Sequence, residues 1–165
     1  NYKGRKTYEN MIYSYENFLT PIECQYFINQ HSKLFNPATD QRTFYHRKTK
    51  VIDYSLFFVQ DSKKLNGRLN FTVKNIDTEA FVNYFQIVEW PTEEFQPTHK
   101  DFEYHYYTSI IYLNSDFEGG ETFVEKKEIK PKQGLMVLFA GDKMIHGVNK
   151  ITKGTRYTIP CWYTK

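Results

Sequence analysis

The second half of this chain, from Ala80 onward, is a series of short apolar runs separated by turn-forming residues. Glycine, proline, aspartate and asparagine stand between the runs. Aromatic and β-branched side chains favour strands, and closely spaced short strands are typical of an antiparallel sandwich or barrel. The pattern therefore predicts a β unit over about 80–165. Five runs carry this prediction: FVNYFQIVEW, YYTSIIYLN, ETFVEKKEI, GLMVLFAG and RYTIPCWYT.

Length and composition agree with one such unit. The chain has 165 residues, which suits a single domain, and we predict one domain over 1–165. It contains 14 Tyr, 14 Phe and 2 Trp, an aromatic content of 18% that strengthens the strand prediction. The net charge of +3 permits an anionic small molecule. Without a basic stripe or a recognition motif, no nucleic-acid partner is expected.

The first half predicts two helices over about 15–75, packed on one sheet of the β unit. Thr20-Pro21-Ile22-Glu23 has the residue types of a capping box with proline at the first helical position. This helix would run to about His31, with an apolar stripe at Ile22, Phe27 and Ile28. A second helical stretch is predicted over roughly 55–75. Its expected buried side consists of Leu56, Phe57, Leu65 and Leu69.

Two polar segments flank the first helix. Residues 1–10 predict a tail or an edge strand, and residues 35–50, which are basic and rich in turn formers, predict a mobile loop or an irregular hairpin. Cys24 and Cys161 lie far apart in no metal-binding spacing and are expected to be reduced, buried thiols. No apolar run reaches the length of a membrane span, and no signal peptide is visible. A soluble, cytoplasmic protein is expected, with a trimmed leader or anchor left open; the oligomeric state is left open too.

His99-Lys100-Asp101 is the first candidate metal-binding feature. In an extended chain, residues two apart face the same side, so this imidazole and this carboxylate would converge. They would supply two members of a 2-His-1-carboxylate triad, which leaves open positions on Fe(II). The alternative for such a short motif is a surface turn after Pro97.

His146 is the candidate third ligand. It follows a strongly apolar strand, Leu135 to Ala140, and a later strand beside the first could bring it to the same metal. The alternative is an ordinary, partly buried histidine at a strand end.

Arg156 and Thr158 suggest a carboxylate-binding strand. A guanidinium can bind a carboxylate with two hydrogen bonds, and Thr158 shares its strand face. Together they could hold the far carboxylate of a dicarboxylic cosubstrate. The alternative for Arg156 is a surface salt bridge. Tyr112 has the same strand parity as Thr108 and Ile110, so it either lines a pocket or is a core aromatic.

The order and spacing of these motifs resemble a known family. The motifs are HKD, IYLN, EGGETF, PKQG with Phe139, HGV and GTRYTIPCWY. Over about residues 80–164 they are similar to the 2-oxoglutarate- and Fe(II)-dependent oxygenase superfamily, and closest to its prolyl 4-hydroxylase-like branch. The resemblance implies a double-stranded β-helix, a cupin-like jelly roll, with the N-terminal helices packed on one sheet.

The resemblance also implies roles for individual residues. His99, Asp101 and His146 would be the iron ligands, and Arg156 would pair with the far carboxylate of 2-oxoglutarate. Tyr112 would bind the same carboxylate, with Thr122 and Thr158 close to the cosubstrate. Trp162 would border the substrate entrance. Tyr104 and Arg47 are further candidates for substrate contact.

The implied activity is that of an Fe(II)- and 2-oxoglutarate-dependent dioxygenase. It would use O2 to hydroxylate an unactivated C–H bond, release succinate and CO2, and take ascorbate as a candidate reductant. A prolyl residue in a peptide or protein is the favoured substrate. The alternatives are a free amino acid or small metabolite, or a cupin-like metal-binding module without catalysis. Two departures put the substrate in question: WPTEEF stands where the family often has YxxGxxY, and Arg156 stands where many collagen-type enzymes have lysine.

Overall fold

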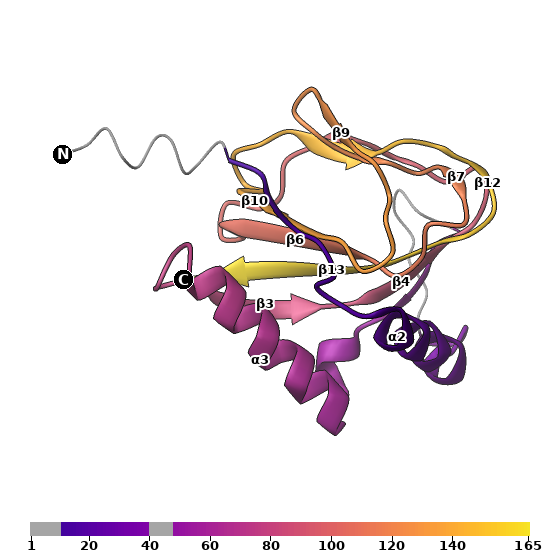
Figure 1. The fold of residues 1–165 in the computed structure, drawn as a ribbon, viewed down its shortest axis with the longest axis horizontal. Coiled ribbons are helices and arrows are strands. Elements are labelled where there is room, and N and C mark those ends of the chain that lie inside the picture. The colour runs from indigo at the N-terminus through magenta and orange to yellow at the C-terminus, as the bar shows by residue number, and fades with distance from the viewer. Residues whose placement is uncertain (1–10, 40–47) are drawn as a thin grey trace.

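In the part of the chain that the structure describes, the protein is mainly β, with two α-helices on one side (Figure 1). The structure is a computed structural model that describes residues 11–39 and 48–165. The predictions made for residues 1–10 and for residues 40–47 of the 35–50 segment, Arg47 among them, lie outside these described ranges. Within the described end of the 35–50 segment, Lys50 begins a strand.

Seven strands form the large sheet. Their order is β1-β10-β6-β13-β4-β2, and β3 also pairs with β13. The long strand β13 is central, because it pairs with β6, β4 and β3 along its length. The bounds are β1 Tyr13–Tyr15, β2 Lys50–Ile52, β3 Phe81–Phe85, β4 Ile87–Trp90, β6 Tyr107–Tyr112, β10 Met136–Phe139 and β13 Arg156–Thr164.

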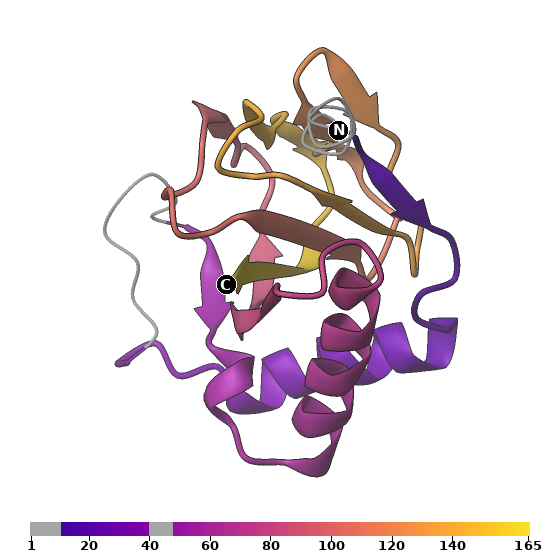
Figure 2. The same cartoon turned by 90° about the vertical axis from the view of Figure 1, so that its left-hand side faces the viewer.

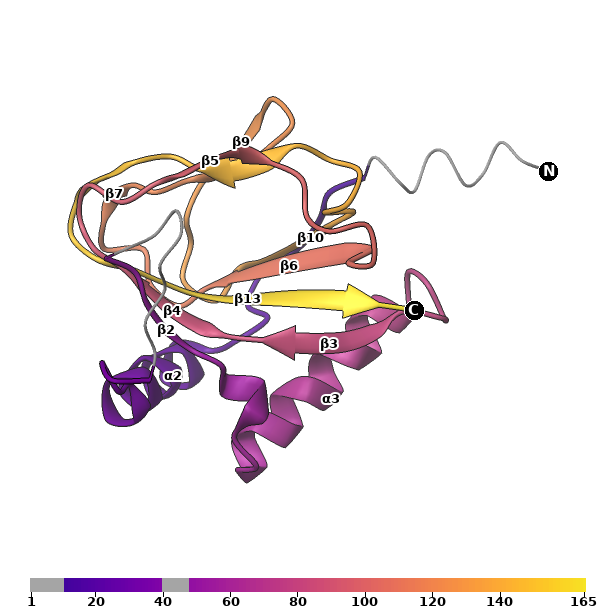
Figure 3. The ribbon, with the colours of Figure 1, turned by 180° about the vertical axis from the view of Figure 1, so that it is seen from behind.

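A small sheet lies across from the large sheet. Its order is β5-β11-β8-β9, and a two-stranded sheet pairs β7 with β12. Figure 3 shows these strands on the side of the large sheet that faces away from the helices. The two antiparallel layers are those of a jelly roll, as the family resemblance implies. The bounds are β5 Gln96–His99, β7 Glu118–Gly119, β8 Thr122–Val124, β9 Lys127–Ile129, β11 His146–Val148 and β12 Ile151–Lys153.

The first helix, α2 (Pro21–Leu34), begins at the predicted capping box. The Glu23 N–H donates to Thr20 Oγ1 at 3.2 Å, and the Thr20 N–H donates to Glu23 Oε1 at 3.0 Å. The predicted stripe is wrong at Ile22, which is 84% exposed, whereas Cys24 and Phe27 are buried. Ile22 precedes Phe27 by five residues and therefore faces another side of the helix, while Cys24 precedes it by three.

The second predicted helix is split in two. A 3₁₀ turn (Tyr54–Leu56) and α3 (Gln60–Lys74) are separated by a short extended segment. This segment is the run Phe57-Phe58-Val59, whose aromatic and β-branched side chains favour helix less than straight-chain residues do. Leu65 and Leu69 are buried as predicted, but Leu56 is 68% exposed.

Both helices cover the outer face of the large sheet, as Figure 2 shows. The main core lies between the helices and the large sheet and contains Leu69, Ile111 and Ile159. It also contains Cys24 and Cys161, which are buried free thiols as predicted. The simple order of helices followed by strands is wrong in detail. β1 pairs with β10 and β2 pairs with β4, so two short strands of the first half complete the sheet. Among the described helices, none is both long and apolar enough to cross a bilayer.

Candidate active site

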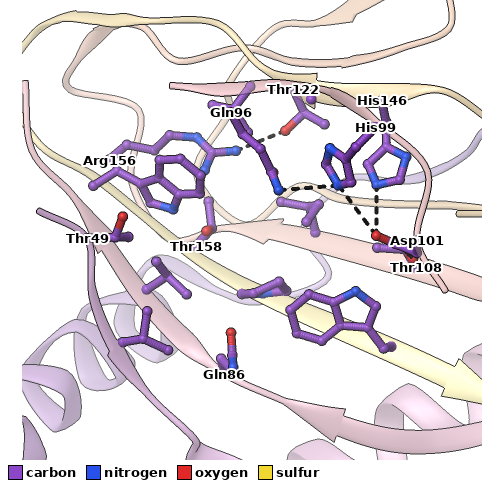
Figure 4. A pocket seen from close by; sticks show the side chains of 18 residues that line it. Thr49, Gln86, Gln96, His99, Asp101, Thr108, Thr122, His146, Arg156 and Thr158 are labelled. Carbon is purple, nitrogen blue, oxygen red and sulfur yellow. Dashed lines mark hydrogen bonds and ion pairs between the residues drawn. The ribbon is translucent and has the colours of Figure 1, made fainter. Parts of the chain in front are cut away.

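Three side chains that the sequence singles out meet between the two sheets. His99 ends β5 and His146 begins β11, and the two residues are direct partners in the strand register. Asp101 lies two residues beyond β5, where its N–H donates to the Gly141 carbonyl at 2.9 Å. Asp101 Oδ1 is 3.5 Å from His99 Nε2 and 3.3 Å from His146 Nε2 (Figure 4). One ligand atom from each residue therefore lies within 4.8 Å of the others.

The backbone sets the tautomer of both imidazoles. His99 Nδ1 lies 3.0 Å from the Pro97 carbonyl oxygen, and His146 Nδ1 lies 2.9 Å from the Met144 carbonyl oxygen. A carbonyl only accepts, so each Nδ1 carries a proton, and in the neutral ring each Nε2 then presents a lone pair. Two lone pairs and a carboxylate that point at one place repel each other unless a cation lies between them. This donor set, two imidazoles and one carboxylate, fits a divalent metal such as Fe(II).

Asp101 is held in its ionised form. Burial alone would raise the pKa of this carboxyl group, but the neighbouring imidazoles of His146 and His99 and the hydrogen bond from Thr108 bring it well below its ordinary value. The Thr108 hydroxyl donates to Oδ2, which leaves Oδ1 facing the imidazoles. Burial lowers the pKa of His99, but the neighbouring Asp101 carboxylate and the contact with the Pro97 carbonyl, both of which favour the protonated ring, raise it by more, so the net shift is upward.

Gly141 makes room for this carboxylate. A Cβ atom built on Gly141 would collide with Thr108 Oγ1 and with Asp101 Oδ2. Sequence reasoning did not single out Gly141, although its place directly after the apolar strand 135–140 is a signal that could have drawn attention to it.

Arg156 forms a second feature of the site, a buried cation. Arg156 is the first residue of β13, where it pairs with Trp90 of β4, and only 1% of the residue is exposed. Nε donates to the Gly120 carbonyl at 2.9 Å, and Nη2 donates to Thr122 Oγ1 at 2.9 Å. The rings of Trp90 and Tyr112 flank the guanidinium, with centroids 5.0 Å and 5.4 Å from Cζ.

No acidic side chain in the described part of the chain forms an ion pair with Arg156. Burial lowers the pKa of this guanidinium, because the charged form is poorly solvated there, and the nearby Tyr112 and Glu121 offset this only in part. A buried charge without a counter-ion is costly, and an anion would relieve the cost. The arrangement therefore fits a ligand that brings its own carboxylate.

A cavity of about 260 Å³ joins the two features. His99, Asp101 and His146 line it together with Arg156, and Figure 4 shows both groups facing the same space. Among the remaining lining residues are Thr122, Thr158 and Trp162, three further residues that the sequence singled out. Trp162 stacks on Tyr84, with ring centroids 4.7 Å apart.

Three other candidates are placed differently. Tyr112 does not belong to the cavity lining; it lies behind Thr122, where its hydroxyl donates to Thr122 Oγ1 at 2.8 Å and accepts from the Thr122 N–H at 2.9 Å. Tyr104 is 52% exposed, stacks on Phe102 and is also absent from the cavity lining. Arg47 falls in the part of the chain that the structure does not describe.

Sequence reasoning missed several residues that line the cavity. Trp90 lies in the stretch that departs from the family pattern, so that departure was a signal for it. Thr49, Gln86 and Gln96 gave no signal, because they border the short strands β2, β4 and β5, whose faces are recognisable only once the sheets are paired.

Comparison with protein families and curated proteins identifies relatives of this chain. The family model of the 2OG-Fe(II) oxygenase superfamily matches residues 82–164. Prolyl 3-hydroxylase 2 of Gallus gallus is 41% identical over 66 residues, which cover 35% of this chain and 10% of that protein. Prolyl 3-hydroxylase 2 of Homo sapiens is 39% identical over 66 residues, 35% of this chain and 9% of that protein. The chain thus spans about a tenth of the length of these relatives.

Solved structures share the fold at low sequence identity. The viral collagen prolyl hydroxylase of Paramecium Bursaria Chlorella virus-1, in a 2OG complex, has a TM-score of 0.71 and 17% identity over 93% of this chain and 94% of that chain. A prolyl-4-hydroxylase of Pseudomonas putida has a TM-score of 0.73 and 14% identity over 94% and 93%. HygX of Streptomyces hygroscopicus, with nickel and 2-oxoglutarate bound, has a TM-score of 0.74 and 12% identity over 99% and 86%.

Proposed function

We propose that this chain, which belongs to the 2OG-Fe(II) oxygenase superfamily, hydroxylates a prolyl residue in a peptide or protein. The family makes the chain a 2-oxoglutarate-dependent dioxygenase that uses Fe(II), 2-oxoglutarate and O2. The single observation that carries the assignment to this cavity is that the His-Asp-His cluster and the buried Arg156 line the same cavity.

Each residue of the candidate site has a distinct role in this proposal. His99, Asp101 and His146 hold the metal, and Arg156 holds the far carboxylate of 2-oxoglutarate, with Thr158 and Thr122 close to it. Tyr112 acts indirectly, because it positions the Thr122 hydroxyl that Arg156 contacts. When bound, the metal and cosubstrate supply the oxidation of an unactivated C–H bond by O2, with succinate and CO2 as products.

The protein itself keeps Asp101 ionised and correctly oriented, and it excludes water from the cavity. The Thr108 hydroxyl and the Gly141 carbonyl hold Asp101 in place as a carboxylate. The cavity lining also carries apolar side chains such as Val51, Val88 and Trp90, which keep water away from the reacting groups. Ascorbate as a reductant stays a prediction.

The charges of the cavity favour a peptide over a free amino acid, and its aromatic surface favours a prolyl ring. A free amino acid brings an ammonium and a carboxylate group, and each would need a partner of opposite charge. Among the described lining residues, the charged side chains besides the histidines are Arg156 and Asp101, which the cosubstrate and the metal would occupy. Trp162, stacked on Tyr84, offers a flat apolar surface against which a pyrrolidine ring could pack. The similarity to prolyl 3-hydroxylases points the same way.

An anaerobic binding assay followed by turnover tests the proposal. Fe(II) and 2-oxoglutarate together are expected to give a visible charge-transfer band, and O2 is then expected to release succinate. A proline-rich peptide should stimulate succinate release and gain one oxygen atom by mass. A metal-binding module without catalysis would release no succinate. Stimulation by a free amino acid, with none by the peptide, would contradict the prolyl assignment.

A further inference from the structure

Gln96 contacts the nitrogen atom that a metal at this site would need. Its amide Nε2 lies 3.2 Å from His99 Nε2. The Nδ1–H of His99 is directed to the Pro97 carbonyl, so His99 Nε2 is the acceptor and the Gln96 amide is the donor. The amide therefore occupies the lone pair through which His99 would bind a metal.

A β-bulge puts Gln96 and His99 on the same side of β5. Residues three apart in a regular strand face opposite sides of a sheet. Here His99 pairs with His146 and Gln96 pairs with Val148, so three residues of β5 advance against two of β11. The extra residue turns both side chains into the cavity. Gly147 permits the close approach, because a Cβ there would lie 2.6 Å from the Gln96 carbonyl oxygen.

The Gln96 side chain lies between the two halves of the site. Figure 4 shows it extending through the space between Arg156 and His99. Its amide forms no other hydrogen bond with the described residues. Once a metal takes the His99 lone pair, this part-buried N–H loses its acceptor in the cavity and is free to donate to a ligand beside the metal.

We propose that Gln96 is a binding residue for the 2-oxo acid end of the cosubstrate. This inference rests on the proposed function. In the metal-free protein the amide donates to His99 Nε2; in the loaded protein it donates to an oxygen atom of the 2-oxo acid group. A dicarboxylic 2-oxo acid is then held at both ends by this chain's side chains, by Gln96 near the metal and by Arg156 at the far carboxylate.

The proposal predicts opposite effects on two binding constants. In Gln96→Met, which keeps the side-chain length and removes the amide, Co(II) or Ni(II) affinity without cosubstrate should be unchanged or higher, because a competing hydrogen bond is gone. The affinity for 2-oxoglutarate, titrated anaerobically through the charge-transfer band of the Fe(II) form, should fall about tenfold, as expected for one lost hydrogen bond to a charged group.

Two further variants sharpen the test. Gln96→Glu keeps the shape but replaces the donor by an anion, so its 2-oxoglutarate affinity should be below that of Gln96→Met. Gln25→Met is the matched control, because the Gln25 amide donates to Asn29 on an exposed part of α2. Both binding constants of this control should equal those of the unaltered protein.

Three outcomes would overturn the proposal. Unchanged 2-oxoglutarate affinity in Gln96→Met would remove the assigned contact. A parallel loss of metal and 2-oxoglutarate affinity would show that Gln96 only supports the structure. If the unaltered protein itself gives no charge-transfer band, the proposed function fails and this inference fails with it. If the band is normal and Gln96→Met binds 2-oxoglutarate with unchanged affinity, only this inference is contradicted.

Discussion

At the scale of single residues, the site depends on close packing around Asp101 as much as on its three donors. Thr108 and Gly141 hold this carboxylate from the side opposite the imidazoles. Neither would bind the metal, yet both determine where Oδ1 points. Residues that orient a metal ligand typically change metal affinity by about tenfold to a hundredfold when altered.

Gly141→Ala should therefore weaken metal binding although the three donors stay in place. The added methyl group must displace Asp101 or Thr108, and we expect metal affinity to fall by about tenfold to a hundredfold in a calorimetric titration with Co(II). Gly67→Ala is the control, because nothing lies within 4 Å of a Cβ at this exposed position of α3. Equal affinity in both variants would contradict the packing argument.

Arg156→Met should separate cosubstrate binding from metal binding. The variant removes the buried guanidinium but keeps an unbranched apolar side chain between Trp90 and Tyr112. The 2-oxoglutarate affinity of the Fe(II) form should fall about a hundredfold, because charge-assisted hydrogen bonds are lost, while metal affinity stays close to its original value. Arg68→Met, which removes a surface ion pair with Glu23, serves as the control. Unaltered affinity for 2-oxoglutarate would defeat the role given to Arg156.

At the scale of secondary-structure elements, the sequence is most informative where a local signal and a local structure coincide. The capping box at Thr20 was predictable because all of its hydrogen bonds lie within four residues. The break between the 3₁₀ turn and α3 was not predicted, because the pattern of apolar residues continues through a segment that is extended. Three-residue strands such as β1 and β2 are too short to show alternation, so only their partners identify them.

Thr20→Ala tests the contribution of this cap to stability. Loss of the side-chain acceptor for the Glu23 N–H should lower the free energy of unfolding by about 1 kcal/mol, measured by urea denaturation. Thr78→Ala, at an exposed turn position, should leave the unfolding free energy nearly unchanged. A similar loss in both variants would show that the hydroxyl of Thr20 contributes nothing specific.

At the scale of the whole molecule, the two sheets bring together segments that are distant in the chain. His99 and His146 become neighbours only because β5 pairs with β11, and Arg156 reaches the same cavity only because β13 runs through the centre of the opposite sheet. The helices contribute to this arrangement indirectly, by covering the outer face of the large sheet and burying the core that contains both cysteines.

The two cysteines report on the integrity of that core. Burial, with a smaller contribution from Glu23, raises the pKa of Cys24 to about 11, and burial raises the pKa of Cys161 strongly as well. Because the thiolate is the reactive form, neither cysteine should react with iodoacetamide at about pH 8 in the native protein, and both should react in urea. Rapid labelling of either cysteine in the native state would contradict the packing described here.

The sequence by itself determined the chemical identity of the site: an imidazole–carboxylate pair, a later imidazole, and an arginine followed by a threonine on one strand face. It also determined the β character of the second half, because alternation and turn residues act over a few neighbours. Only the tertiary structure decided that Tyr112 stands behind Thr122, that Gln96 reaches His99 Nε2, and that Gly141 borders Asp101. These relations depend on strand register, on a bulge and on the pairing of distant segments, and such pairing is settled by the packing of the complete sheets rather than by any local run of residues.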